Sequence, residues 1–359
     1  MGIKQICVSI GCTLFLGTGS YAQTVQLSVA LSPDMHNEET IDLYNESRNL
    51  RVSIPSSGKS TYKQNINLPD KGFYMLEQVG KLYLAPKNSL QITSDDTKQY
   101  IFKGKQATEN ELLAKLAVLR QQMLPENTSM PGVPTFKLLK QSVPDFLITV
   151  DAYKTAVAEL VNSSEDSHFK ELVIGDADSY SRVMLQGFSG SHGADSVLHE
   201  QAQLYFQNPA SKNDPNYSFK HLRMRILPYY DDFLNEEDLE TVRKAYTDHL
   251  DLNDKDLLQN SPSYAKIVSI ISFSDMPIDE KRMQESYDKR FESIPEKFED
   301  EQFVEEMQVQ QGAEYLHFLH GLGLDIEGAY SHLKSLVTSQ KVNERIDKLY
   351  AALKKPNSI

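Results

Sequence analysis

The stretch YIFKGKQATENELLAKL, residues 100–116, contains the change in hydrophobic period that decides the fold class. Before it, apolar and polar residues alternate, which is typical of β-strands. After it, Leu112 and Leu116 recur at the spacing of one face of a helix. Thr108 is followed three residues later by Glu111, a pattern typical of a capping box. We therefore predict that strands precede this stretch and that a helix begins at Thr108.

Working back toward the N-terminus, residues 23–105 read as a series of short strands. In TVQLSVAL, for example, Val25, Leu27 and Val29 share one face of an extended chain. Short turns rich in Ser, Pro, Asp and Gly separate the apolar runs. Such connections join antiparallel neighbours, because a parallel crossover needs about a dozen residues or more. The pattern predicts an N-terminal antiparallel β-sandwich over residues 23–105.

Working forward, residues 106–359 are predicted to form a mainly α-helical domain, so the chain belongs to the α+β class. Proline and glycine residues divide the helical pattern into segments. Asn235 and Asp254 each precede such a segment and are predicted N-caps. The glycine-rich residues 187–193 are interpreted as a hinge between two helices.

The first 22 residues have the parts of a secretory signal peptide. Lys4 lies near the start, an uncharged stretch from Ile6 to Gly17 follows, and Ser20, Tyr21 and Ala22 form a small-x-small end. The uncharged stretch is too short to span a bilayer, which takes roughly 20 apolar residues. Cleavage after Ala22 would export the protein to the periplasm or the cell envelope. A lipoprotein signal that ends at Cys12 is the alternative interpretation.

Composition excludes several classes of function. Both cysteines, Cys7 and Cys12, lie in the expected signal peptide, so the mature chain would lack Cys-based zinc sites and thiol chemistry. The net charge is −13 and no run of Lys or Arg exceeds two residues, which disfavours nucleic acid and anionic membrane surfaces as partners. The sequence has no P-loop, HExxH or dinucleotide-binding motif, and no cofactor is predicted.

One stretch, LQGFSGSHGADSVLHE, contains candidate site residues. Ser189 and Ser191 lie in a run like a nucleophile elbow, although Ser191 stands where the elbow requires glycine. His192, Asp195 and His199 have spacings of three and four, so on a helix they could share a face and reach one metal ion. An envelope hydrolase that uses Ser189 or Ser191 with a nearby histidine is therefore the enzymatic alternative. No catalytic or metal-binding role is assigned to these five candidates.

Two segments, GFYMLEQVGKLYLAPKNSLQITSD and YIFKGKQATENELLAKL, carry a family resemblance. They resemble the upstream region of exported TlpA-like thiol-disulfide oxidoreductases, in which a small β-domain leads into helices. The positions that match the family pattern are Leu82, Tyr83, Leu84, Pro86, Leu90, Ile92, Phe102, Gly104 and Asn110. The resemblance extends along nearly all of the chain after the signal peptide.

The resemblance also implies what is missing. Family members continue into a thioredoxin-like domain with a Trp-Cys-x-x-Cys site, whereas this chain has no tryptophan and ends about where that domain would begin. We therefore expect a non-catalytic binding or accessory protein of the cell envelope, without a transmembrane span in the mature chain. A docking subunit for a separate thioredoxin-like oxidoreductase is a further alternative.

Overall fold

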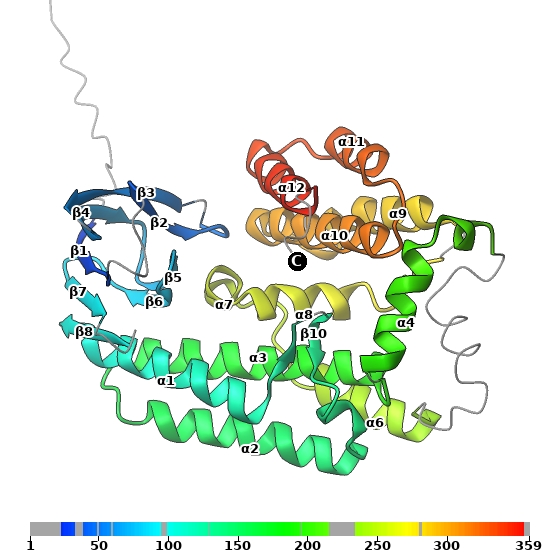
Figure 1. The fold of residues 1–359 in the computed structure, drawn as a ribbon, viewed down its shortest axis with the longest axis horizontal. Helices are drawn as coiled ribbons and strands as arrows, with labels where there is room; N and C mark the ends of the chain where they lie inside the picture. Colours follow the sequence, from blue (N-terminus) through cyan, green and yellow to red (C-terminus); the bar gives the residue numbers. More distant parts are fainter. Residues whose placement is uncertain are drawn as a thin grey trace, which may run out of the picture.

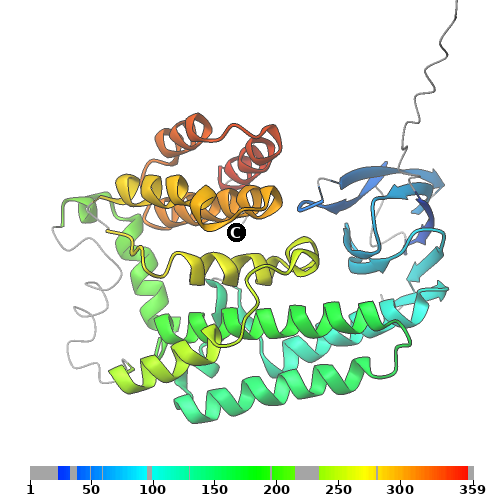
Figure 2. The ribbon, with the colours of Figure 1, turned by 180° about the vertical axis from the view of Figure 1, so that it is seen from behind.

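The structure is a computed structural model, and it has the mixed α+β architecture that the change of period predicts (Figure 1). It describes residues 23–32, 39–48, 50–58, 60–94, 99–128, 130–194, 196–214, 234–279 and 282–354. The expected signal peptide, residues 1–22, lies outside these described residues. A sheet at one end of the molecule is followed by layers of helices, and the view from behind shows the same layers (Figure 2).

Eight strands form one curled sheet in the order β6-β5-β2-β3-β4-β1-β7-β8. The strands are β1 (Gln23–Ala30), β2 (Thr40–Asn45), β3 (Leu50–Gly58), β4 (Thr61–Leu68), β5 (Gly72–Leu76), β6 (Gly80–Leu84), β7 (Ser89–Ser94) and β8 (Tyr100–Gly104). The predicted sandwich of two stacked sheets is not confirmed. The apolar face of β1 is buried as its alternation predicts, with Val25, Leu27 and Val29 fully inaccessible to solvent.

The prediction of purely antiparallel pairing is wrong for one pair of strands. β1 pairs in parallel with β7, so that Leu27 lies beside Leu90 and Val29 beside Ile92. The other pairs of strands in this sheet are antiparallel. Short connections constrain only strands that follow one another along the chain. β1 and β7 are far apart in sequence, so the rule that short connections join antiparallel neighbours does not apply to them.

Three groups of helices pack beside the sheet (Figures 1 and 2). The first group comprises α1 (Ala107–Met123), α2 (Val143–Val161), α3 (Ser167–Ser191) and α6 (Glu236–Thr247). The middle group is α7 (Lys255–Asn260) and α8 (Pro262–Ser272), and the third is α9 (Met283–Lys297), α10 (Glu301–Gly321), α11 (Ile326–Leu336) and α12 (Gln340–Leu353). α4 (Ser196–Gln207) crosses between them at the end remote from the sheet, and β9 (Glu126–Asn127) and β10 (Met130–Pro134) form a small hairpin after α1.

The predicted helix starts are confirmed at two positions and wrong at a third. Asn235 and Asp254 cap α6 and α7, and each side chain accepts a hydrogen bond from a backbone N–H in the first turn. Thr108, however, lies inside the first turn of α1, whose N-cap residue is Gln106. Asn110 fixes this start, because its side-chain amide donates a 2.7 Å hydrogen bond to the Gln106 carbonyl.

The interpretation of residues 187–193 as a hinge is also corrected. Helix α3 continues through Gly187 and Gly190 and ends at Ser191. The chain turns only at Gly193, whose positive φ of 71° is readily adopted by glycine. Gly187 instead allows close packing, because a Cβ there would lie 2.1 Å from the Gly132 carbonyl oxygen of β10.

Side chains of the sheet are continuous with the core of the first helix group. Phe73 of β5 and Tyr83 of β6 are both buried and lie edge-on to Phe169 of α3, with ring centroids 6.4 and 5.1 Å away. Asn110 of α1 accepts a hydrogen bond from the Tyr83 backbone N–H and donates one to its carbonyl, both at 3.0 Å. Asn260 at the end of α7 accepts from the Phe73 N–H at 2.7 Å. The β5–β6 hairpin is therefore held by helices on two sides.

Replacing Asn110 by alanine is expected to lower the free energy of unfolding by about 1–2 kcal/mol, because the buried Tyr83 N–H loses its partner. Urea denaturation of the purified variant measures this loss. Gln122→Ala, at an exposed position of the same helix, is the control and should leave stability nearly unchanged. Equal stability of the two variants would contradict this role of Asn110.

Among the helices within the described residues, none combines the length and the apolar character needed to cross a membrane.

Candidate functional site

A cavity of about 320 Å³ lies where the β5–β6 hairpin meets α1, α2 and α3. Its volume is at the lower end of the range for small-molecule sites, which is roughly 300–1,000 Å³. The hairpin contributes Phe73 and Lys81, α2 contributes Tyr153, and the remaining walls come from α1 and α3. Residues from four separate segments therefore converge on one space.

A buried carboxylate organises the charged side of this cavity. Asp176 of α3 is only 8 % exposed, and its Oδ2 lies 2.8 Å from Lys81 Nζ and 3.4 Å from Arg120 Nη2. Its Oδ1 accepts a 2.6 Å hydrogen bond from the Ser261 hydroxyl. The guanidinium of Arg120 also lies over the Tyr180 ring, 3.9 Å from the centroid. Each charged side chain is thus held by at least one further group.

Burial and the two neighbouring cations have opposing effects on the pKa of Asp176. Burial raises the pKa of this carboxyl, but Lys81 and Arg120 together lower it by more than burial raises it. The net pKa therefore lies below the usual value of 3.8. Burial likewise raises the pKa of Tyr153, which therefore stays protonated at neutral pH. At neutral pH the cavity consequently contains two cations and one anion.

This pKa predicts how stability depends on pH. The pKa of Asp176 is lower in the folded protein than in the unfolded chain. The ionised carboxylate therefore adds its full contribution to the free energy of unfolding above pH 3.8, and this contribution is lost as the pH falls through the folded pKa. The difference in free energy of unfolding between the wild type and Asp176→Asn should be constant near neutral pH and shrink below pH 3.8. Urea titrations across this range measure it. Asp151→Asn, at an exposed side chain, is the control, and a difference that does not shrink would refute the prediction.

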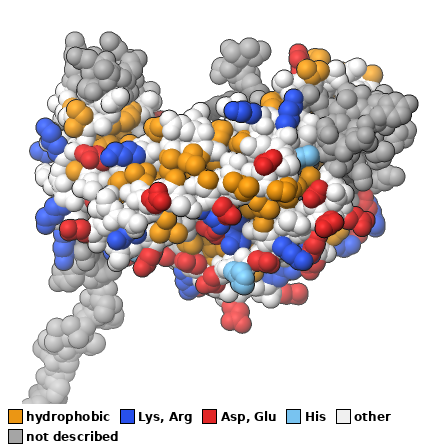
Figure 3. Space-filling view, turned by 90° about the horizontal axis from the view of Figure 1, so that it is seen from below, with side chains coloured by type: hydrophobic (Ala, Val, Ile, Leu, Met, Phe, Trp, Pro, Cys, Tyr) orange, Lys and Arg blue, Asp and Glu red, His pale blue; other side chains and the backbone are white. Residues whose placement is uncertain are grey.

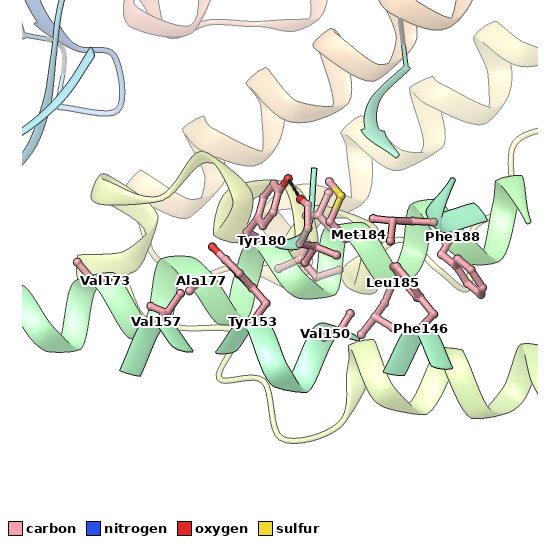
Figure 4. Close-up of a cluster of buried hydrophobic side chains, with 14 of the residues drawn as sticks. Phe146, Val150, Tyr153, Val157, Val173, Ala177, Tyr180, Met184, Leu185 and Phe188 are labelled. Carbon is pink, nitrogen blue, oxygen red and sulfur yellow. Dashed lines mark hydrogen bonds between the residues drawn. The ribbon is translucent and has the colours of Figure 1, made fainter. Parts of the chain in front are cut away.

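The apolar side of the cavity is an extension of the core between α2 and α3. Figure 4 shows Tyr153, Val173 and Ala177 in one row with Tyr180, at one end of a cluster that continues to Phe146 and beyond. The Tyr180 hydroxyl donates a 2.9 Å hydrogen bond to the Leu124 carbonyl. Because the surrounding side chains are closely packed, the apolar wall is preformed rather than dependent on a ligand.

A second cavity of about 170 Å³ adjoins the first and shares Phe73 and Lys81 with it. It lies between β2, β5, α7, α10 and α12. Glu306 and Arg345 form a bidentate ion pair in its wall, with nitrogen–oxygen distances of 2.5 and 2.9 Å. This pair is internally neutral. The second cavity therefore extends the first without adding to its excess of positive charge.

A hydrogen-bond network at the β5–β6 hairpin joins three elements. The Tyr83 hydroxyl of β6 donates to Asp166 at 3.0 Å and lies 3.0 Å from His168 Nδ1. His168 Nε2 lies 2.7 Å from Asp256 Oδ2 of α7. Tyr83 is 1 % exposed, and burial raises its pKa far above the usual range. The network therefore fixes the hairpin and does not present a reactive phenol.

Among the four candidate site residues that the structure describes, no contact between a serine and a histidine side chain forms a catalytic pair. Ser189 lies within α3 and donates a 2.8 Å hydrogen bond to the Gln186 carbonyl of its own helix, while Ser191 is the last residue of that helix. His192 Nε2 lies 3.0 Å from the Gln141 carbonyl, and His199 of α4 lies 3.0 Å from Gln203. Burial lowers the pKa of His199. A nucleophile elbow needs a serine between a strand and a helix, not within a helix.

The fifth candidate, Asp195, lies outside the described residues. In the part of the chain that the structure describes, no group of three or more His, Cys, Asp or Glu side chains is placed to hold a metal ion.

The residues that do converge, Lys81, Arg120 and Asp176, were not among the candidates from sequence. They come from β6, α1 and α3, and no short motif contains them. One signal was present, because Asp176 interrupts the apolar face of α3 between Val173 and Tyr180. A carboxylate on a buried helix face requires a partner, and such positions indicate a buried charge cluster.

We compared the chain with protein-family models, curated proteins and solved structures, and none of the three comparisons finds a match.

Proposed function

We propose that this chain is a non-catalytic binding protein, and that the cavity beside the β5–β6 hairpin is its small-molecule site. The observation that carries the proposal is the convergence of Lys81, Arg120 and Asp176 in the wall of a preformed apolar cavity. Ligand sites commonly combine apolar walls with a few placed polar groups. Binding across the hairpin and three helices would also join elements that are distant in sequence.

The state of the charged groups favours binding over catalysis. Both oxygens of Asp176 already accept hydrogen bonds or ion-pair contacts, and its pKa is lowered. A carboxylate with a depressed pKa is a weak general base, and it carries no proton to donate near neutral pH. Lys81 and Arg120 lie beside this carboxylate and can attract an anionic group. The charged groups of the site are therefore suited to binding an anionic ligand and not to proton transfer.

The expected signal peptide and the TlpA-like resemblance suggest where this binding would occur. An exported protein without cysteines would act in the periplasm or the cell envelope, as an accessory protein without redox activity of its own. Cell fractionation with an antibody against the chain tests this location. Recovery in the cytoplasmic fraction at full precursor mass would contradict export.

Ligand-observed NMR with a library of neutral, cationic and anionic small molecules tests the binding function. We expect saturation transfer from the protein to at least one compound, and recovery of that compound chemically unchanged. Ala117→Phe should abolish the signal, because Ala117 lies in the cavity wall at an exposed position of α1. Ala114→Phe, on the same helix but outside the cavity, is the matched control. Equal signals from both variants, or conversion of the compound, would count against the proposal.

A second function, docking of another protein, is favoured by one surface, and the TlpA-like resemblance suggests a thioredoxin-like oxidoreductase as the partner. Figure 3 shows hydrophobic side chains gathered in a band on the face that lies beneath the helices in Figure 1. Val118 of α1 and Ile148 of α2 are 55 % and 66 % exposed. Exposed apolar patches often mark protein-binding surfaces. Ile148→Glu should then abolish capture of such an oxidoreductase from envelope extract, whereas Phe318→Glu on α10, in the third helix group, should not. Capture unaffected by Ile148→Glu would exclude this surface.

A further inference from the structure

We infer that the ligand of this cavity is a small organic monoanion, with a carboxylate that contacts Lys81 and Arg120 and an apolar body that contacts Phe73 and the α1–α3 walls. This inference rests on the proposed function and adds the chemical class of the ligand.

The charge balance of the residues that line the cavity favours an anion. Lys81 and Arg120 contact the same oxygen of Asp176, so two cations face one carboxylate. The second oxygen of Asp176 is engaged by the neutral Ser261 hydroxyl. One positive charge therefore remains without a compensating charge among the residues that line this cavity. A lysine carries three N–H donors and an arginine five, which leaves both side chains with donors for a ligand.

The size of this excess favours a monoanion over a dianion. A phosphate monoester carries about −1.5 to −2 charges at neutral pH, whereas a carboxylate carries one. Only the carboxylate matches the single excess charge. The second cavity adds no unpaired cation for a further negative charge, because Arg345 in its wall pairs with Glu306. Its other acidic side chain, Glu46, pairs with Arg51 and Lys348. The chain as a whole has a net charge of −13, which also disfavours a dianion.

The geometry of Arg120 is suited to a planar carboxylate. Its guanidinium lies over the Tyr180 ring at 3.9 Å, and this contact restricts its orientation. A guanidinium held by stacking offers its edges to hydrogen-bond acceptors and can bind a carboxylate with two parallel hydrogen bonds. Lys81 adds a point charge from the β5–β6 hairpin, with its Nζ 5.0 Å from the centroid of the Phe73 ring. The two cations thus belong to different elements and converge on one end of the cavity.

The rest of the cavity accepts the body of the ligand. Its apolar walls are formed by Phe73, Leu113, Leu116, Tyr153, Val173 and Ala177. Apolar surface buried here is removed from water, which is the main source of affinity for an uncharged body. The adjoining cavity, which also includes Phe73 and Lys81, leaves room for a substituent. An amphiphilic acid can contact both the charged end and the apolar walls of the cavity, whereas a fully hydrophilic acid leaves the apolar walls without a contact.

Isothermal titration calorimetry with matched probes tests this class. The probes are phenylpropionate and octanoate, their alcohols phenylpropanol and octanol, and their phosphate esters. We expect both acids to bind the wild-type protein and the alcohols and phosphate esters to bind about ten-fold more weakly. Alcohols that bind as tightly as the acids, or phosphate esters that bind more tightly, would overturn the inference while leaving the site itself in place.

Variants test the residues that are assigned to the carboxylate. Arg120→Gln and Lys81→Met should each weaken the acids by about ten-fold and leave the alcohols unchanged. Lys115→Gln, an equal change of charge at an exposed position of α1, should affect neither. Equal losses for acids and alcohols would overturn the assignment. If these variants fail to fold, the comparison of probes on the wild-type protein still decides the question. If no probe binds, the class is wrong, and the NMR screen with Ala117→Phe separately tests the site.

Discussion

Arg345→Met is expected to lower the free energy of unfolding by about 3–5 kcal/mol, because it leaves the buried Glu306 carboxylate without its cation. The Glu306 and Arg345 side chains are 5 % and 13 % exposed, and two nitrogen–oxygen contacts join them. After the substitution, the carboxylate would keep only weaker contacts with the Ser47 hydroxyl and the Gln310 amide. A buried charge without a counterion is among the costliest single defects in a protein core.

Guanidinium denaturation of the wild type and the variant measures this loss. Arg243→Met is the matched control, because Arg243 pairs with Glu240 at the solvent-exposed surface of α6, and its loss should leave stability nearly unchanged. A double variant, Glu306→Leu with Arg345→Met, should recover much of the stability, because two buried apolar side chains leave no charge without a counterion. If Arg345→Met is as stable as Arg243→Met, the ion pair does not have the buried geometry described above.

Gly187→Ala has the second large expected effect, a loss of about 3 kcal/mol. The added Cβ would meet the Gly132 carbonyl oxygen at 2.1 Å and the Val133 Cα at 2.9 Å. Both contacts are with backbone, which cannot move aside as a flexible side chain can. The hairpin of β9 and β10 would therefore have to shift away from α3, and the packing between them would be disrupted.

Gly190 of the same helix provides the control for this prediction. No atom lies within 4 Å of the position that its Cβ would occupy, and the residue is exposed. Gly190→Ala should therefore raise the free energy of unfolding, by at most about 0.5–1 kcal/mol, because alanine is the better helix former. Thermal and urea unfolding of both variants give the comparison. Two variants of equal stability would refute the close approach of β10 to α3.

The same pair of glycines shows how far the sequence could predict the structure. The run GFSGS has the composition of an elbow or a hinge, and nothing local distinguishes these from a helix that packs closely on another segment. The difference lies in Gly132, which is distant in sequence. By contrast, the N-caps at Asn235 and Asp254 were predictable, since a cap depends only on the residues that follow it.

In the sheet and in the site, too, local features were predictable from the sequence and contacts between distant segments were not. The alternation in β1 predicts its buried face, because period two is a local property. The parallel pairing of β1 with β7 depends on contacts between distant segments and was missed. Lys81, Arg120 and Asp176 also lie far apart in sequence and meet only in the folded chain. Asp176, a charge on an apolar helix face, was the one local sign of the cluster.

Methyl NMR during titration with phenylpropionate would locate the bound ligand directly. We expect the methyl signals of Leu113, Leu116 and Val173 in the cavity walls to shift and saturate together, while Val118, exposed on the same α1 helix, stays unchanged. Shifts confined to Val118 and other surface methyls, with the three wall residues unaffected, would show that the cavity is not the ligand site.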